Sequence, residues 1–127
     1  MIDWSKSKYF KKNENWGEST KMSPILIDML NEFREFVDKP IIIHCGYSTD
    51  GHSTNSYHYR GLAVDLHIQN IHYIEQLVLA MQYKKFNGIG VYPYWNSPGL
   101  HLDIRDTSSI IWYQDNKKRY HYIKGVK

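Results

Sequence analysis

The chain has 127 residues, of which 42% are hydrophobic and 23% are charged, and its formal net charge is +3. This balance is typical of one globular domain and excludes global disorder. No stretch approaches the ~20 apolar residues that a membrane span requires, and the first residues show no signal peptide.

The excess positive charge lies in short clusters that we interpret as solvated surface. None of them is interleaved with the glycine and aromatic pattern of a nucleic-acid-binding module, so a nucleic-acid partner is not expected. The only cysteine, Cys45, excludes an internal disulfide and is expected to be a buried thiol after the apolar run 41–43. The basic clusters are Lys11-Lys12, Lys84-Lys85 and Lys117-Lys118-Arg119.

In chain order, the first ~20 residues are polar and aromatic, and we expect them to wrap the surface of the domain. A helix is then predicted, because Ser23 can cap its start, Pro24 suits its first position and apolar residues follow at helical spacing. Pro40 ends this helix. Residues 46–61 are rich in Gly, Ser, Thr and Asn, which predicts a long loop.

A second helix is predicted after Asn70, which can act as its N-cap. Its apolar stripe is expected to be Ile71, Ile74, Leu77, Val78 and Met81. Strands are predicted at 41–45, 62–68, 88–92 and 100–104, followed by a hairpin of 110–114 and 119–123. Two helices with five or six strands predict an α+β domain with a small, mostly antiparallel sheet.

Two segments, 56–65 and 99–105, place polar side chains on predicted strands. Because side chains alternate along a strand, His101 and Asp103 share one face, about 7 Å apart, opposite an apolar stripe. By the same alternation, Asp65 lies on the polar face of the other strand. Both strands therefore present groups that can bind a metal ion.

Gly61 would let the loop turn, so that the His58 imidazole can converge with the Asp65 carboxylate. Together with His101, these side chains form the three-ligand set of a catalytic zinc site, in which a fourth position stays open for water. The same spacing also fits two amphipathic strands whose polar faces are merely wet. The residues alone leave both interpretations open.

The run 56–65 matches the signature Ser-x-His-x-x-Gly-x-Ala-x-Asp, and in this it resembles the zinc D-Ala-D-Ala carboxypeptidase and murein endopeptidase family. The pair His101 and Asp103, which follows the segment 88–92, resembles the second metal segment of that family. The resemblance covers roughly residues 15–113. It implies the peptidase-like α+β fold that is shared with the hedgehog domain.

From its length we expect one domain over residues 1–127, and we expect it to be a monomer. The resemblance further implies cleavage of peptide bonds in bacterial peptidoglycan. It implies zinc held by His58, Asp65 and His101. Asp103 is then expected either to accept a hydrogen bond from a ligand imidazole or to serve as the catalytic general base. Substrate-binding or supporting roles are expected for Ser56, Tyr47 and Arg105.

The sequence departs from the family pattern at two positions. Many members carry an arginine after the Gly-Tyr pair, where it can hold a substrate carboxylate, but here Tyr47 is followed by Ser48. Arg60 or Arg105 can take its place. A missing arginine weakens the case for a carboxypeptidase more than for an endopeptidase, because only a carboxypeptidase must recognise a free C-terminus.

The second departure is Pro98, which lies where several branches carry the proton-transfer group. Asp103 is therefore our candidate base, with His52, Asp50 and His44 as alternatives. We expect a zinc-dependent endopeptidase delivered to the cell wall by a phage or by another export route. The alternative is a non-catalytic, zinc-containing domain of the same fold that binds cell wall or a protein partner.

Overall fold

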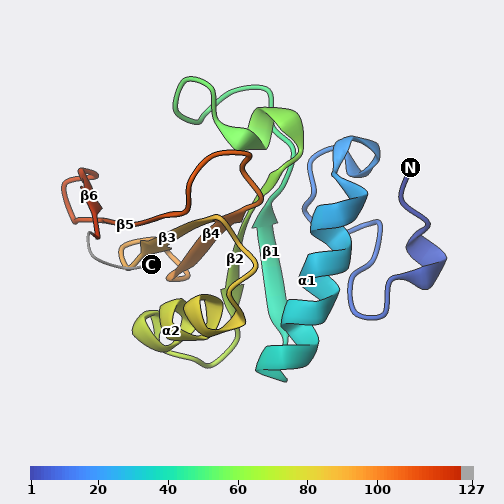
Figure 1. Cartoon of the computed structure of the whole chain (residues 1–127), viewed down its shortest axis with the longest axis horizontal. Coiled ribbons are helices and arrows are strands. Elements are labelled where there is room, and N and C mark those ends of the chain that lie inside the picture. The colour runs from blue at the N-terminus through green and yellow to red at the C-terminus, as the bar shows by residue number, and fades with distance from the viewer. Residues whose placement is uncertain (124–127) are drawn as a thin grey trace.

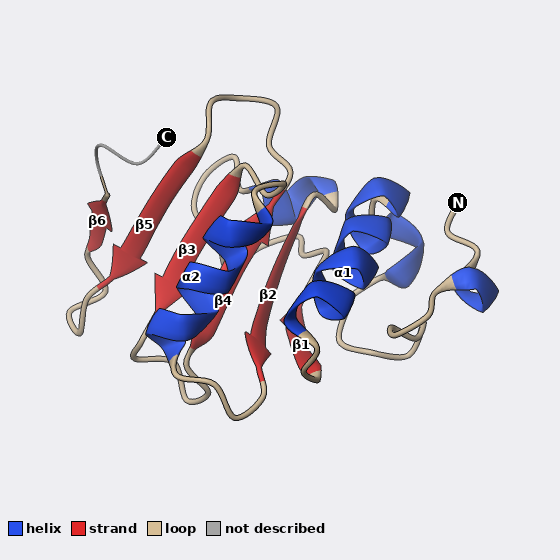
Figure 2. Ribbon diagram, turned by 60° about the horizontal axis from the view of Figure 1, so that its bottom comes forward, coloured by secondary structure: helices blue, strands red, loops and turns tan. Residues whose placement is uncertain are grey.

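The computed structural model describes residues 1–123 and shows a six-stranded sheet with two helices packed on one face (Figures 1 and 2). The strand order is β1-β2-β4-β3-β5-β6, and every neighbouring pair is antiparallel except β3 and β5. The predicted α+β class, with two main helices and a mostly antiparallel sheet, is confirmed. The helices are α1 (Pro24–Val37) and α2 (Tyr73–Tyr83), and the strands are β1 (Ile41–Cys45), β2 (Ala63–Ile68), β3 (Gly88–Tyr92), β4 (Gly99–Asp103), β5 (Ile110–Gln114) and β6 (Tyr120–Tyr122).

Helix α1 begins as its sequence predicts. The hydroxyl of Ser23 accepts a hydrogen bond from the backbone N–H of Leu26, and Pro24 occupies the first turn. The helix ends at Asp38, which adopts a left-handed conformation with φ 53°. None of the described helices is long and apolar enough to cross a membrane.

Helix α2 differs from its prediction in both its cap and its buried face. The N-cap is His72, whose Nδ1 accepts from the backbone N–H of Ile74 at 3.1 Å, whereas Asn70 precedes the helix in a left-handed turn. Ile74 and Val78 are 52% and 44% exposed, while Gln76 is only 1% exposed. The amide of Gln76 is buried because the backbone satisfies it: it accepts from the N–H of Ile68 and donates to the carbonyls of Ile71 and Pro98.

The two faces of the sheet have opposite character. Its helical face carries fully buried apolar side chains, as the alternation along β2 and β4 predicts. Its other face carries Asp65 and His101, which are directly opposite each other in the antiparallel register. From the N-terminal segment, Phe10 and Trp16 are buried in the apolar core. The buried side chains of β2 and β4 are Val64, Leu66, Ile68, Leu100 and Leu102.

Candidate metal centre

Three side chains from separate elements converge on the polar face of the sheet. Asp65 and His101 come from the neighbouring strands β2 and β4, and His58 comes from a short 3-10 helix, Tyr57–Arg60, in the long loop. Oδ1 of Asp65 lies 3.1 Å from Nε2 of His58 and 3.2 Å from Nδ1 of His101. The structure thus brings together the three residues that the sequence singled out as ligands.

Ser56 and Gly61 explain how the loop presents His58. The Ser56 hydroxyl caps the 3-10 helix by accepting from the backbone N–H of His58 at 3.2 Å. Gly61 ends it at φ +68°, where its N–H bonds to the His58 carbonyl and where a Cβ atom would collide with the Lys21 carbonyl. Only glycine combines this backbone conformation with such a close approach.

The outward side of each imidazole is bonded to an acceptor. Nδ1 of His58 donates to the Gly46 carbonyl at 2.8 Å, and Nε2 of His101 donates to Oδ2 of Asp103 at 2.7 Å. In a neutral imidazole the other nitrogen then carries a lone pair. Two lone pairs and the Asp65 carboxylate consequently point at one another, an arrangement that needs positive charge between them, either protons or a metal ion.

The electrostatics of the three groups agree with this requirement. Burial lowers the pKa of His58, but hydrogen bonds to Asp65 and Cys45 and the nearby Asp65 charge outweigh it and raise the pKa to about 10. Burial raises the pKa of Asp65, yet the hydrogen bonds from His101 and His58 hold it well below its usual range. Without metal the cluster therefore holds protons, which a bound ion would displace.

The spacing and chemistry of these donors fit zinc. Zinc bonds of about 2.0 Å to nitrogen and oxygen at tetrahedral angles place ligand atoms about 3.3 Å apart. The observed separations of 3.1 and 3.2 Å, from Asp65 to His58 and to His101, are close to that value. Two imidazoles and a carboxylate also suit zinc's intermediate softness.

Asp103 is fully buried behind His101, with an exposed fraction of 0%. Arg105 donates to its carboxylate through Nε at 2.9 Å and Nη2 at 2.7 Å, and the Arg105 backbone N–H adds a third bond. Burial raises the pKa of Asp103, but Arg105 and His101 bring it down to about 2. On β3, Gly88 leaves the space that this carboxylate fills, because a Cβ there would collide with it. No sequence pattern marks that role of Gly88.

Cys45 and His52 lie beside the three predicted ligands. The register of β1 shifts between Ile43 and Cys45, so Cys45 pairs with Asp65 across the strands and turns to the polar face. Its predicted burial is therefore wrong: Cys45 is half-buried. Its sulfur lies 3.7 Å from Nε2 of His52, whose ring stacks on that of His58. Cys45 and His52 have no fixed sequence spacing from the three predicted ligands, so no sequence motif indicates that they lie beside them.

The other candidate bases lie elsewhere. Nε2 of His44 is 2.6 Å from Nδ1 of His67, on the far side of Asp65 from the loop, and Asp50 is exposed. Tyr47 is half-buried against the apolar core, and its backbone N–H bonds to Trp16.

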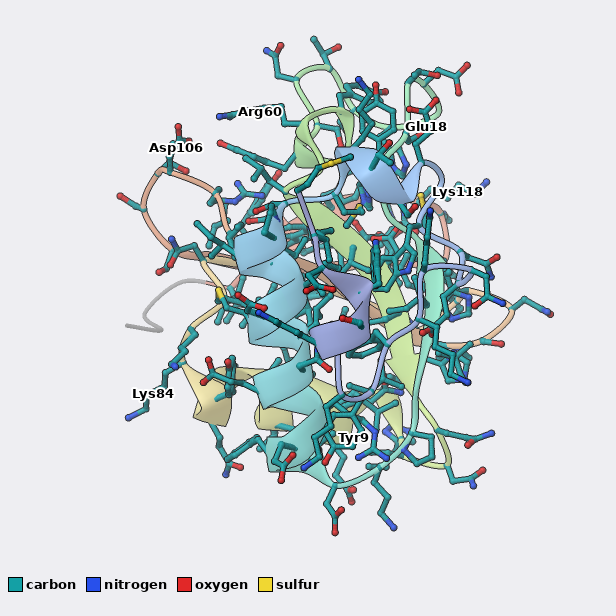
Figure 3. The ribbon with its side chains drawn as sticks, turned by 90° about the vertical axis from the view of Figure 1, so that its right-hand side faces the viewer. Tyr9, Glu18, Arg60, Lys84, Asp106 and Lys118 are labelled. Carbon is teal, nitrogen blue, oxygen red and sulfur yellow. The ribbon has the colours of Figure 1, made fainter. Side chains whose placement is uncertain are left out.

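A cavity of about 650 Å³ opens over the metal centre. Arg105 is the only lysine or arginine among the described residues in its wall. Arg60 is not among the residues that line the cavity, and it pairs with Asp106 at the surface, at 3.7 Å; Figure 3 labels both side chains. The wall also contains Ser56 and His52. Its aromatic members are Tyr57, Tyr92, Trp95, Trp112, Tyr120 and Tyr122.

An α+β domain with two imidazoles and a carboxylate at the floor of an open cavity has the build of a metal-dependent hydrolase. The family model described as "Peptidoglycan L,D-endopeptidase MepK" matches residues 6–109. The chain therefore belongs to this family of zinc peptidoglycan peptidases, and the resemblance noted in the sequence is confirmed. No curated protein matches the chain.

Proposed function

We propose that this protein is a zinc-dependent endopeptidase that hydrolyses peptide bonds in the stem or cross-link peptides of peptidoglycan. The observation that carries the proposal is the convergence of His58, Asp65 and His101: both imidazoles are held from behind, and all three side chains present an acceptor atom to the same point. Family membership supports peptidoglycan as the substrate.

The chain supplies the ligands, their orientation and a path for protons. Zinc bound by these residues would polarise the scissile carbonyl and lower the pKa of the attacking water. Gly46 and Asp103 fix the orientation of the two imidazoles, so that Nε2 of His58 and Nδ1 of His101 remain available to the metal.

In this proposal Asp103 orients His101 and does not take the proton from water. Its carboxylate is fully buried and already accepts from His101 and Arg105, so it has no path to the cavity. His52 is a better proton acceptor, because it lines the cavity beside His58 and Asp65. Burial and the neighbouring His58 lower the pKa of His52, which keeps its imidazole neutral and able to accept a proton.

The charges around the cavity favour an endopeptidase over a carboxypeptidase. A carboxypeptidase needs a cation for the free C-terminal carboxylate, but the guanidinium of Arg105 is engaged by Asp103 through two hydrogen bonds. Arg60 is paired outside the cavity. The aromatic wall, in which Tyr92 and Trp95 stack at 4.3 Å, suits uncharged parts of a substrate.

The proposal is tested by mass spectrometry of muropeptides after the zinc-loaded protein is incubated with purified peptidoglycan. We expect cross-linked dimers to be cut, or stem peptides to be shortened at an internal bond. His101→Ala should abolish both the cleavage and the zinc content. His67→Ala, on the same face of β2 but outside the three-ligand set, is the matched control and should retain both.

Other results would change the assignment. Release of the terminal amino acid alone would identify a carboxypeptidase. No cleavage of several wall types by protein that holds zinc would favour the non-catalytic domain that binds cell wall or a protein partner. Equal zinc content in His101→Ala and the wild type would refute the ligand assignment itself.

A further inference from the structure

The aromatic wall of the cavity continues beyond the metal centre onto the hairpin of β5 and β6, and β6 is the edge strand of the sheet (Figure 2). The family model matches the chain up to residue 109, so the match ends just before this hairpin begins. Kinship alone therefore gives no account of this part of the wall. The hairpin side chains that line the cavity are Ile110, Trp112, Gln114, Tyr120 and Tyr122.

One row of residues across the sheet connects the hairpin with the metal centre. His101 on β4 pairs with Gly90 on β3, and Gly90 pairs in turn with Trp112 on β5. Trp112 then pairs with Tyr122 on β6. Because neighbouring strands lie about 4.8 Å apart, the row from His101 to Tyr122 extends over about 14 Å. An extended peptide of about four residues covers the same distance, so one ligand can reach both ends of the row.

Trp112 forms the fixed middle of this row. Its ring lies over Gly90, where a Cβ atom would collide with it. The ring also packs against the imidazole of His101, with the centroids 5.1 Å apart, and its Nε1 donates to the Tyr92 hydroxyl at 3.0 Å. The floor between the metal centre and the outer tyrosines is therefore rigid and aromatic.

The hairpin is braced on the face that lies away from the cavity. There the ring of Tyr113 stacks on that of His121, with 4.8 Å between the centroids and 13° between the planes. His121 also hydrogen-bonds to Asp115 in the turn, at 2.8 Å. On the cavity face, Tyr120 and Tyr122 remain 46% and 57% exposed. Two exposed rings on a braced hairpin are preorganised for a ligand.

The chemistry of this surface favours a sugar over a charged stem peptide. All of the hairpin side chains in the wall are uncharged. A tyrosine offers an apolar ring face and a hydroxyl at its edge, and the amide of Gln114 adds a donor and an acceptor. Stem peptides carry carboxylates, for which this surface provides no counter-charge. An N-acetylated amino sugar is uncharged, with apolar C–H faces and with hydroxyl and amide groups at its edge.

We propose that Tyr120 and Tyr122, together with Gln114, form a subsite for an N-acetylated amino sugar of the glycan strand. The inference rests on the proposed peptidoglycan endopeptidase activity. A stem peptide is joined to the glycan through its first residue, so a sugar held at the hairpin brings a bond of the attached peptide to the metal centre. The protein therefore prefers stem peptides that are still attached to glycan.

The test compares two substrates that differ only in their sugars. One is a cross-linked muropeptide with its disaccharides, and the other is the same peptide after an amidase has removed them and its new N-termini have been acetylated. We expect the wild type to cleave the sugar-bearing substrate with a kcat/KM about tenfold higher. Tyr122→Ala should raise KM for that substrate about 3- to 10-fold, with kcat unchanged and no effect on the sugar-free peptide.

Tyr113→Ala is the matched control, because it removes a tyrosine from the opposite face of the same hairpin. It should leave the kinetics of both substrates unchanged. Undiminished cleavage of the sugar-free peptide by Tyr122→Ala would show that this variant is folded. Equal wild-type kcat/KM for the two substrates, or an equal loss on both in Tyr122→Ala, would overturn the subsite while leaving the peptidase intact.

A binding experiment tests the subsite without any cleavage. Peptide-free N,N′-diacetylchitobiose is titrated into the protein, and tryptophan fluorescence reports binding because Trp95 and Trp112 line the cavity. We expect saturable binding that Tyr122→Ala weakens about 3- to 10-fold and that Tyr113→Ala leaves unchanged. If neither peptide substrate is cleaved, the proposed function fails, and this titration still decides the subsite. Equal affinity of the wild type and Tyr122→Ala, or no binding by either, would refute it.

Discussion

Nε2 of His101 donates to Oδ2 of Asp103 at 2.7 Å, and this single bond decides which nitrogen of His101 faces the metal position. The carboxylate behind it is fully buried and neutralised by Arg105, so it is a fixed acceptor. A histidine ligand supported in this way keeps one tautomer and one ring orientation. Asp103 can either support His101 or take the proton from water, and replacing its carboxylate by an amide separates these two roles.

Asp103→Asn should weaken zinc binding by about 10- to 100-fold, because the amide holds the His101 tautomer less firmly. It should also lower the free energy of unfolding by about 2 kcal/mol, since Arg105 loses its charged partner. Zinc affinity is measured by competition with a chelator, and stability by urea denaturation. If affinity is unchanged while turnover by zinc-saturated enzyme falls about 100-fold, Asp103 is the general base after all.

The absence of a side chain at Gly88 should matter for the orientation of His101 as much as the hydrogen bond from His101 to Asp103 does. A Cβ at this position collides with the Asp103 carboxylate, so Gly88→Ala should displace that carboxylate and reduce zinc affinity. Gly90→Ala, on the same strand, meets the ring of Trp112 instead and is the matched control. Chelator competition should show a larger loss for Gly88→Ala; equal losses would point to a general disturbance of β3.

The strands and the convergence of the three candidate ligands could be predicted because they depend on local patterns. Alternation along β2 and β4 places Asp65 and His101 on one face whatever the remainder of the chain does. The Ser-x-His-x-x-Gly spacing builds the turn that carries His58 through bonds between near neighbours. The kinship with the hedgehog domain, the single-domain extent and the monomeric state remain predictions.

The features that escaped the sequence depend on contacts between distant segments. Gln76 lies outside the apolar stripe predicted for the second helix, and two of its backbone partners come from β2 and from the loop before β4. Cys45 faces Asp65 because the register of β1 against β2 shifts before it, and no sequence pattern predicts this shift. His52 approaches the centre because the Tyr59 hydroxyl bonds to both its N–H and its carbonyl.

His52→Ala tests the proton acceptor in the proposed reaction. Because His52 lies outside the three-ligand set, the variant should retain its zinc while turnover falls about 100-fold. Steady-state cleavage of a purified cross-linked muropeptide measures the loss. His44→Ala is the matched control, since that imidazole pairs with His67 and not with the loop, and it should retain turnover. A greater loss of turnover in His44→Ala than in His52→Ala would assign proton transfer to His44.

Gln76→Leu should be strongly destabilising although the new side chain is apolar and similar in size. It removes three hydrogen bonds at a site that water does not reach, and it leaves the N–H of Ile68 and the carbonyl of Pro98 without their side-chain partner. Unsatisfied buried groups of this kind cost about 3 kcal/mol or more together. Gln82→Leu, at an exposed position of the same helix, should change the unfolding free energy by less than about 0.5 kcal/mol.

Because Pro98 precedes the strand that carries His101, Gln76→Leu should also weaken zinc binding, which a chelator competition would detect. Equal stability of the two variants in urea would show that α2 does not depend on this amide for its attachment to the sheet.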